Sequence, residues 1–500
     1  MSNYFYNLLK IFMINKISNT GFNFDNSYIE LPPEFYSPAN LQPVKSPQLV
    51  ILNNELSNSL GLNTDFLKSQ EGIYIMSGNI KIPDGAYISQ AYAGHQFGGF
   101  TMLGDGRTLL IGEQITPSNQ RFDIQLKGSG RTPYSRNGDG RAVLGPMLRE
   151  YIISEAMHGL NIPTTRSLSV ISTGENVYRE TIQQGAILTR VASSHIRFGT
   201  FEYAAYMLDY EKLKKLSDYT IKRHFPFLEN NENKYINLLD EVIKLQASLV
   251  AKWQSVGFIH GVLNTDNMSI CGETIDYGPC AFMDVYNPDT VFSSIDTNGR
   301  YAYKNQIAIV NWNLYRLAET LLPIINLDEN KAIELAQNSL SKFINLATSN
   351  LSHEMCSKIG IFEPKTSDID LLNELLNMMQ KYKEDYTNTF IALTFNDLPQ
   401  KGMFISEEFI NWKKKWEETL TLQNKSKDEV FDLMKNSNPA VIPRNHRVEE
   451  ALSAANNGDF SVMDNLLKAL SNPFEHSEFQ KEYAKLPSTP QCNYRTYCGT

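Results

Sequence analysis

Cysteine is scarce in this sequence, with only five residues among 500. They follow no regular spacing, which excludes the disulfide framework that holds small secreted domains together. Cys271 and Cys280 are close enough along the chain to share a zinc ion. However, no Cys-x-x-Cys pair or histidine partner accompanies them, so we expect small buried side chains instead. The sequence therefore indicates a protein of a reducing compartment.

Excess positive charge and long apolar runs are also lacking. The net charge of −9 argues against a nucleic-acid partner, because the phosphate backbone would favour a basic face. No run of about 18 apolar residues occurs, so we expect no membrane span. The leader has no arginine and no small-residue cleavage site, which disfavours secretory and transit peptides. We expect a cytoplasmic protein, with the mitochondrion as the alternative, and Met13 as an alternative start to Met1.

Strand-like runs with turn signals begin after an irregular stretch rich in Pro and Asn. Phe100–Leu103 and Thr108–Ile115 flank Gly104-Asp105-Gly106, which predicts a hairpin with a glycine-rich tip. A third strand follows and ends at Lys127. Glycines at the tip would let backbone N–H groups approach phosphate oxygens, because no Cβ intervenes.

A helical pattern follows from Arg141, and Glu150 lies in the middle of its apolar face. Two more strand-like runs, at 166–173 and 185–193, complete a predicted sheet of five strands carrying one helix. This is the plan of a kinase small lobe.

Helical periodicity dominates the rest of the chain. One apolar pattern from Ile236 to Trp253 predicts a long buried helix that ends at Gly257, just before the segment "FIHG". Further helices are predicted at 307–322, 330–347, 367–384, 406–436 and 447–470. A kinase large lobe delivers its catalytic loop from such a helix.

We therefore predict an α+β, protein-kinase-like fold of two lobes. Its expected parts are a leader at 1–75 that wraps the core, a small β-rich lobe at 76–205, a helical large lobe at 206–395, and a helical C-terminal extension with a cysteine-containing tail at 396–500.

The segment "HGVLNTDNMSICGETIDYG" carries the chemistry of such a fold. Counted from His260, a kinase places its catalytic Asp two residues on and its metal-binding Asn seven residues on. Asn267 fits, whereas Val262 occupies the Asp position and can accept no proton. Asp276-Tyr277-Gly278 stands where Asp-Phe-Gly would.

Four residues predict a nucleotide site together. Lys127 would supply a phosphate-binding charge, and Glu150 would hold it by an ion pair. Asn267 and Asp276 offer the hard oxygens that suit Mg²⁺, with Mn²⁺ as an alternative. Each feature alone is commonly structural, but their order along the chain is that of a kinase.

Longer motifs carry a more specific resemblance. These are "YAGHQFGGF", "LGDGRTLLIGE", "DIQLKGSGRTPYSRNGDGRAVLGPMLREYIISEAMH", "HGVLNTDNMSI", "DYGP" and "IPRNHRVEEAL". From about residue 20 to the end, the chain resembles the selenoprotein O family, also called the YdiU family.

The resemblance implies a protein adenylyltransferase. Family members have a kinase-like fold, bind ATP in a flipped orientation, and transfer AMP to Ser, Thr or Tyr hydroxyls of proteins. It implies Asp266 as the candidate base and a metal bound by Asn267 and Asp276. The implied ATP contacts are Gly104, Gly106, Arg107, Lys127, Asp139, Gly140, Arg190, Arg197 and Asp276.

The resemblance also implies a redox residue near the end of the chain. Cys498 reproduces a cysteine or selenocysteine that in some members pairs with a cysteine shortly after the Asp-Tyr-Gly segment. The corresponding stretch here, "NPDTVFSSID", has no cysteine. Cys271, Cys280 or Cys492 could replace the partner, or the disulfide is absent.

Two other functions stay open at the level of sequence. A nucleotide-binding scaffold would bind ATP·Mg²⁺ without turnover, and a conventional kinase would need an Asp at Val262.

Overall fold

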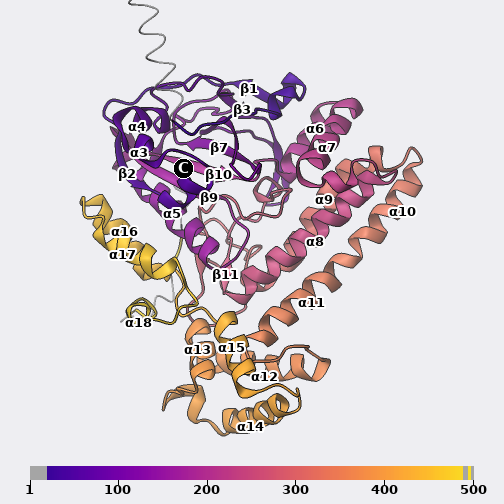
Figure 1. The fold of residues 1–500 in the computed structure, drawn as a ribbon. Coiled ribbons are helices and arrows are strands. Elements are labelled where there is room, and N and C mark those ends of the chain that lie inside the picture. The colour runs from indigo at the N-terminus through magenta and orange to yellow at the C-terminus, as the bar shows by residue number, and fades with distance from the viewer. Residues whose placement is uncertain (1–19, 488–493, 497–500) are drawn as a thin grey trace, which may run out of the picture.

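The computed structural model describes residues 20–487 and 494–496. Its β-rich part is an antiparallel sheet of eight strands, in the order β1-β3-β6-β7-β10-β9-β2, with β8 paired to β10 (Figure 1). The strands are β1 (Tyr36–Pro38), β2 (Gln48–Leu52), β3 (Ile88–Gln90), β6 (Thr108–Ile115), β7 (Arg121–Lys127), β8 (Ala142–Val143), β9 (Arg166–Tyr178) and β10 (Ile182–Ala192).

The expected sheet of five strands is therefore too small, and one of its members is wrong. The strands at 108–115, 166–173 and 185–193 and the strand ending at Lys127 are confirmed. The sheet gains β1 and β2 from the leader, together with β3 and β8. The leader therefore supplies sheet strands as well as connections.

The predicted hairpin between Phe100–Leu103 and Thr108–Ile115 does not form. Instead, β5 (Gly99–Met102) pairs with β4 (Ala93–Gln96) in a separate two-stranded sheet. Asp105 lies between the two predicted strands and is buried, and its carboxylate accepts hydrogen bonds from the Gln90 backbone and the Gln125 side chain. These contacts hold the Gly-Asp-Gly segment as a connection between two sheets.

Helices cover both ends of the sheet. The leader contributes α2 (Asn54–Ser59), α3 (Thr64–Lys68) and α4 (Gln70–Met76). The side chains of Asn53, Asn63 and Ser69 accept hydrogen bonds at the first turns of these three helices, as N-caps do. The helix predicted from Arg141 is α5 (Leu144–Gly159), which packs against β9 and β10.

The helical part is built around α8 (Lys234–Ser255), which confirms the predicted long buried helix. It packs against α9, α10 and α11 and ends just before Gly257, which has a φ of 73°. The expected helix at 330–347 is two helices, because the chain turns at Ser341. The helices here are α6 (Phe198–Met207), α7 (Tyr210–His224), α9 (Gln306–Ile325), α10 (Glu329–Leu340) and α11 (Lys342–Ser357).

Two short strands follow α8 and frame the candidate site. β11 (Phe258–Ile259) pairs with β12 (Ala281–Phe282), and the 21 residues from 260 to 280 lie between them. A one-turn 3₁₀ helix, Thr265–Asn267, lies within this segment. The other 3₁₀ helices are Tyr28–Glu30, Pro33–Phe35, Pro226–Leu228, Tyr303–Asn305 and Gly402–Ile405.

The C-terminal helices divide into two groups. α12 (Thr366–Tyr382), α13 (Tyr386–Phe395), α14 (Glu407–Thr421) and α15 (Lys427–Ser437) surround a core that contains Trp412 and Trp416. By contrast, α16 (Asn445–Asn456) and α17 (Ser461–Leu470) return to pack against α5 (Figure 1). A last short helix, α18, spans Glu478–Tyr483. The proposed domain boundaries at 75, 205 and 395 stay a prediction.

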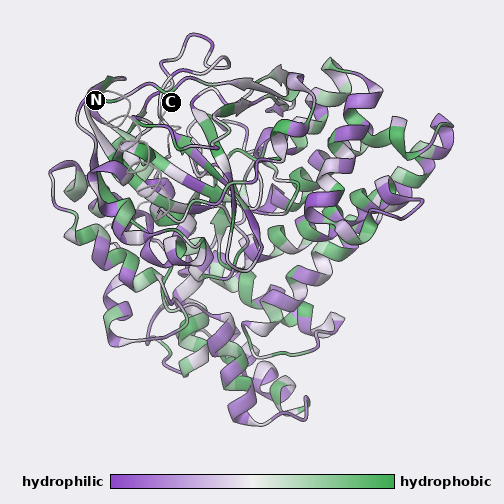
Figure 2. Ribbon diagram, turned by 45° about the horizontal axis from the view of Figure 1, so that its top comes forward, coloured by the Kyte–Doolittle hydropathy of each residue, from purple (hydrophilic) through white to green (hydrophobic). Residues whose placement is uncertain are grey.

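The helices of this part are amphipathic. Figure 2 shows hydrophobic and hydrophilic residues interleaved along them, as expected where each helix buries one face. Among the helices of residues 20–487, none has both the length and the apolar content that a bilayer span requires.

Candidate active site

A cleft of about 1040 Å³ separates the sheet from the helical part. Every site residue predicted from the sequence that falls within the described residues lines it. These are Gly104, Gly106, Arg107, Lys127, Asp139, Gly140, Glu150, Arg190, Arg197, Asp266, Asn267 and Asp276. Cys498 and Met13 lie outside the described residues. The volume is at the upper end for pockets that bind small molecules and cofactors.

The predicted pair of Lys127 and Glu150 forms in the structure. Lys127 is the last residue of β7, and its Nζ lies 2.5 Å from Glu150 Oε2 on α5. The same Nζ lies 3.0 Å from Asp276 Oδ1. Both members of the pair have only 5% of their side chains exposed. Lys127 therefore joins β7, α5 and the Asp-Tyr-Gly segment, as the corresponding lysine does in a kinase.

Asp276 is the centre of the charged cluster. Besides Lys127, it accepts hydrogen bonds from Arg190 Nη1 at 2.6 Å and Arg197 Nη1 at 2.5 Å. Burial alone would raise the pKa of Asp276, but Arg197, Lys127 and Arg190 together hold it well below its usual range. Its backbone has a φ of 63°, which is uncommon for a residue other than glycine. The chain thus turns sharply to present one ionised carboxylate to three cations.

Arg197 joins this cluster to the loop that contains Asp266. The same Nη1 also donates to the backbone oxygen of Asp266 at 2.6 Å. Burial alone would lower the pKa of Arg197, but the nearby Tyr92 and Asp276 outweigh it and raise the pKa above its usual value. The guanidinium therefore stays charged. Its face lies over the Tyr92 ring, 4.7 Å from the centroid.

The catalytic-type loop holds Asn267 and Asp266 in different ways. Asn267 Nδ2 donates to the backbone oxygen of Val262 at 2.8 Å, which commits the amide nitrogen and leaves the amide oxygen for other contacts. Asp266 is buried, and its Oδ1 has no hydrogen-bond partner among the described residues. Burial raises the pKa of Asp266 to about 6, and Arg197 opposes part of that rise.

Three residues of β4 lie against this loop, and no role was predicted for any of them from the sequence. Gln96 Nε2 donates to Asp266 Oδ2 at 3.2 Å, and the His95 backbone donates to Thr265 Oγ1 at 2.7 Å. A Cβ added to Gly94 would lie 2.5 Å from Asp266 Oδ1. These residues could have been found from the sequence, because they lie in "YAGHQFGGF", one of the motifs that carry the family resemblance.

A buried carboxylate supports the same contact from α6. Glu202 accepts hydrogen bonds from Thr265 Oγ1 at 2.8 Å and from His95 Nδ1 at 2.7 Å. Burial raises the pKa of Glu202. β4 and α6 are therefore both tied to the loop at Thr265, the residue before Asp266.

Close packing explains the glycines of the cleft. A Cβ on Gly104 would lie 2.5 Å from the Tyr134 ring, and one on Gly140 would lie 2.0 Å from the Gly130 oxygen. Both glycines have positive φ, 121° and 67°. Their neighbour Asp139 pairs with Arg179 at 2.9 Å at the rim of the cleft.

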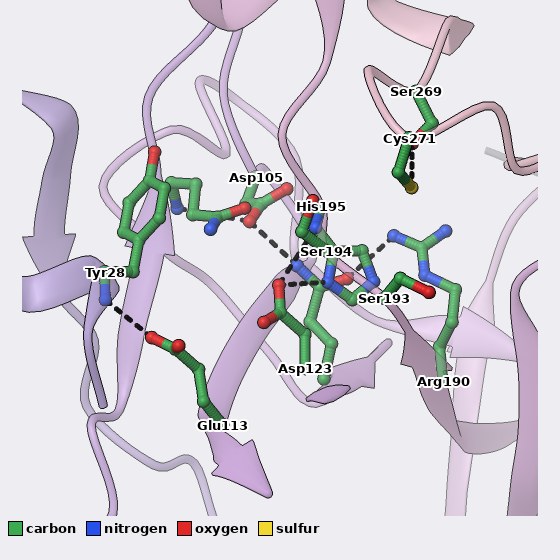
Figure 3. Close-up of polar contacts among 12 residues, drawn as sticks. Tyr28, Asp105, Glu113, Asp123, Arg190, Ser193, Ser194, His195, Ser269 and Cys271 are labelled. Atoms are coloured by element: carbon green, nitrogen blue, oxygen red, sulfur yellow. Dashed lines mark hydrogen bonds and ion pairs between the residues drawn. The ribbon is translucent and has the colours of Figure 1, made fainter. Parts of the chain in front are cut away.

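A second buried cluster fixes the segment that carries both arginines (Figure 3). Asp123 on β7 accepts hydrogen bonds from the His195 backbone at 2.9 Å and from His195 Nδ1 at 3.0 Å. Arg223 of α7 donates to the other carboxylate oxygen at 2.6 Å. Because His195 lies between Arg190 and Arg197 along the chain, these contacts hold both arginines toward the cleft.

The described cysteines form no metal site. Cys271 and Cys356 are free thiols, and residues 20–487 and 494–496 contain no group of three or more His, Cys, Asp and Glu placed to hold a metal ion. A site that used Asp276 would need amide and phosphate oxygens as well.

Comparison with known proteins gives consistent matches over most of the chain. The sequence profile of the family described as "Protein adenylyltransferase SelO" matches residues 19–471. A relative named "Protein nucleotidyltransferase YdiU" from Bacillus cytotoxicus is 62% identical over 487 residues, which are 97% of this chain and 99% of the relative. Proteins of the same name from Clostridium beijerinckii and Brevibacillus brevis are 60% and 59% identical, over 97% and 96% of this chain and 99% and 98% of their own length.

Among solved structures, a match is ROP2 from Toxoplasma gondii, described as a virulence factor with a protein-kinase fold and no enzymatic activity. It is 8% identical and covers 67% of this chain and 88% of its own, with a TM-score of 0.23. At that score the likeness carries no argument about this chain.

Proposed function

Since the chain belongs to the protein adenylyltransferase SelO family, we propose that its cleft binds ATP and transfers AMP to a hydroxyl of a protein, releasing pyrophosphate. The observation that carries the proposal is the cluster of Lys127, Arg190 and Arg197 around Asp276, next to a loop with Val262 in place of the kinase base.

The cations of this cluster suit the distal phosphates of ATP. Lys127, Arg190 and Arg197 are buried and already oriented by Asp276, so little reorganisation is needed when a polyphosphate binds. Arg107 also lines the cleft. If these groups hold the β- and γ-phosphates, the departing pyrophosphate is the better-stabilised leaving group, and the α-phosphorus is left facing the acceptor.

The residues present fit a divalent cation of the Mg²⁺ type. Asp276 offers a carboxylate, and Asn267 offers an amide oxygen because its nitrogen is committed to the Val262 backbone. Mg²⁺ takes one or two protein carboxylates together with phosphate oxygens and water. When bound, such an ion would neutralise charge on the phosphates. Asn267 and Asp276 remain our proposed ligands, and Mn²⁺ would suit the same oxygens.

Asp266 is the proposed acceptor of the hydroxyl proton. The acceptor oxygen of Ser, Thr or Tyr would form a bond to the α-phosphorus while the bond from that phosphorus to the bridging oxygen breaks. The proton would pass to Asp266 Oδ1, whose free lone pairs and burial suit this role. Gln96 holds the other carboxylate oxygen by a hydrogen bond, and the missing Cβ of Gly94 leaves room for the carboxylate. Products are AMP-protein and pyrophosphate.

The two other candidate functions are less well supported. A conventional kinase needs a carboxylate at Val262, where this chain has an apolar side chain that is 7% exposed. A scaffold would not need the buried cluster, because unlike charges in the interior cost desolvation free energy without adding much stability. The expected cytoplasmic location stays a prediction.

The test compares ATP labelled at the α-phosphate with ATP labelled at the γ-phosphate. We expect α-label on protein, stoichiometric pyrophosphate and no γ-label. Transfer of γ-label with ADP release would establish a kinase instead. Nucleotide binding without transfer of either label would establish the scaffold.

A further inference from the structure

We propose that a groove beside the cleft, lined by Phe97, Ile295 and Arg300, binds an extended segment of the acceptor protein with an acidic side chain close to its hydroxyl residue. This rests on the proposed function, because it names how the protein substrate of that reaction is held.

The groove continues directly from the cleft. It encloses about 530 Å³ and is bordered by the tip of the β4–β5 hairpin, by residues 295–300 and by the start of α9. Phe97 and Ile295 line both the cleft and the groove. A chain that lies in the groove therefore leads into the cleft that contains Asp266.

The hairpin tip has an unusual conformation that exposes an aromatic ring. Phe97 has a φ of 52° and Gly98 a φ of 89°, and the Phe97 side chain is 42% exposed. A bulky residue at positive φ is uncommon and is found more often at binding sites, where its surroundings hold it. Here the Phe97 backbone donates to Asn264 Oδ1 at 3.1 Å, and its ring contacts the Tyr301 ring.

The same contacts fix the groove relative to the proposed base. Asn264 Oδ1 also accepts a hydrogen bond from Tyr301 OH, so one amide joins both walls of the groove. Asn264 lies two residues before Asp266 in the same loop. An acceptor segment held between these walls is thus positioned against the catalytic loop rather than against a separate element.

Arg300 supplies a positive charge that pairs with no carboxylate within residues 20–487 and 494–496. Its guanidinium carbon lies 4.8 Å from the Trp312 ring centroid and 5.7 Å from that of Tyr301, with which it also hydrogen-bonds, and its buried Nε has no hydrogen-bond partner among those residues. The nearby Asp296 is buried, and its carboxylate accepts hydrogen bonds from the backbone amides of Arg300 and Tyr301. A carboxylate of the acceptor would complement Arg300.

The shape and exposed side chains of the groove suit an extended segment. Ile295 is 54% exposed and, like Phe97, lines both the cleft and the groove, so the two offer apolar surface for a side chain of the acceptor. A volume of about 530 Å³ is enough for a few side chains of an extended segment.

The experiment uses the full chain, α-labelled ATP and an array of synthetic peptides with one central Ser, Thr or Tyr. Flanking positions carry Glu, Lys or Gln in turn. We expect the wild type to label Glu-flanked peptides most. Arg300→Glu should raise KM for those peptides about tenfold, the effect of losing one charge-assisted contact, and should shift the preference toward Lys.

Two further variants make the result decisive. Lys304→Glu is the matched control, because Lys304 pairs with Asp289 at the surface and does not line the groove, so its peptide preference should equal that of the wild type. Ile295→Glu replaces an exposed side chain where the groove meets the cleft, and so tests the groove even if Arg300→Glu does not fold. It should also disfavour Glu-flanked peptides.

Several results would overturn the inference. One is α-label transfer with equal preference for Glu and Lys flanks in the wild type, or an unchanged preference in both groove variants. Labelling of folded proteins but of no peptide would overturn it as well, because an extended segment would then be insufficient. In each case α-label transfer itself would continue, and only its complete absence from peptides and proteins alike would count against the proposed function.

Discussion

At the scale of single residues, a glycine of the site makes room for the proposed base. Gly94 faces Asp266, and a Cβ there would lie 2.5 Å from Oδ1 and 2.8 Å from the Asp266 Cβ. We expect Gly94→Ala to displace the carboxylate and lower kcat about 100-fold, because small misplacements of a catalytic group cost that much. Transfer of α-label at saturating ATP measures this.

Gly99→Ala is the matched control for that change. Gly99 lies on β5, the partner strand of β4, and a Cβ there would make only an ordinary contact, 3.6 Å from the Gln96 backbone oxygen. We expect wild-type kcat for this variant. A Gly94→Ala protein with undiminished kcat would show that the position of Asp266 is unimportant for transfer.

Asp276 permits a second prediction, which concerns stability as well as activity. Asp276→Asn would leave Lys127 and Arg190 with Glu150 as their remaining ion-pair partner, and would remove the ion pair that Arg197 makes with Asp276. We expect transfer to be lost and the free energy of unfolding to fall by about 3–5 kcal/mol, as when a buried ion pair loses one partner. Denaturant titration gives the second quantity.

The comparison for Asp276→Asn is Asp289→Asn. Asp289 pairs with Lys304 at the surface, and both side chains are more than half exposed. This change should cost less than about 1 kcal/mol. Equal losses in the two variants would contradict the central role of Asp276 in the buried cluster.

Residues of the site differ in how far the sequence could predict them. Lys127, Glu150, Asn267 and Asp276 were predictable because kinase spacing ties each to a type of element. Gln96 was not, since its contact with Asp266 joins positions 170 residues apart and no local pattern encodes it. The functional roles of all of these residues stay proposals.

At the scale of elements, the strand at 99–102 shows why pairing is harder to predict than strand formation. The strand itself was predicted correctly, but the turn that the Gly-Asp-Gly segment indicated does not form, because β5 has two possible partners. β5 pairs with the preceding β4 across a two-residue turn at Phe97-Gly98. The segment that follows β5 is held against the large sheet, because buried Asp105 accepts a hydrogen bond from Gln125 of β7. A contact of this kind depends on tertiary structure.

The end of α7 carries a histidine whose burial predicts acid sensitivity. Burial and the neighbouring Arg223 lower the pKa of His224 to about 3, and its Nε2 contacts Ser194 Oγ. As the pH falls below about 6.5, the unfolded chain binds a proton that the folded chain does not, so stability decreases. From pH 7 to pH 5 this amounts to about 2 kcal/mol for one such group.

We therefore expect His224→Gln to be less sensitive to acid than the wild type over that interval. Free energies of unfolding at pH 7 and pH 5 provide the measurement. His353→Gln, at an exposed position of α11, should keep the wild-type difference. A pH dependence that His224→Gln leaves unchanged would assign the acid sensitivity to other groups.

At the scale of the whole molecule, Arg444 joins parts that are distant in the sequence. Its buried guanidinium contacts Asp284 after β12 and Asp385 before α13, at 2.5 Å and 2.9 Å, and its Nε donates to the Ala484 backbone. Arg444→Met would leave two carboxylates without their cation. We expect a loss of about 3–5 kcal/mol in stability.

Arg447 offers a control three residues further along the chain. It pairs with Glu450 and Glu482, whose side chains are more than half exposed. Arg447→Met should cost at most about 1 kcal/mol. If both arginines proved equally dispensable, the C-terminal segment would have to be held by its apolar contacts alone.

The two-part plan of the molecule was predictable, but the path of its C-terminal third was not. Helical periodicity located α14 to α17 approximately, yet periodicity does not say which surface a helix covers. α16 and α17 cross back to α5, the helix that carries Glu150, so residues far apart in the chain lie side by side (Figure 1).

Because Arg300 stacks on Trp312, the fluorescence of that tryptophan can report on the position of Arg300. Only four tryptophans occur, and Trp253, Trp412 and Trp416 are buried in the two helical cores. Trp312 is partly exposed and lies between Arg300 and Arg316, whose guanidinium carbons are 4.8 Å and 5.1 Å from its ring centroid. Indole fluorescence responds to nearby charge, so displacement of either arginine would change the emission of this one residue while the other three stay constant.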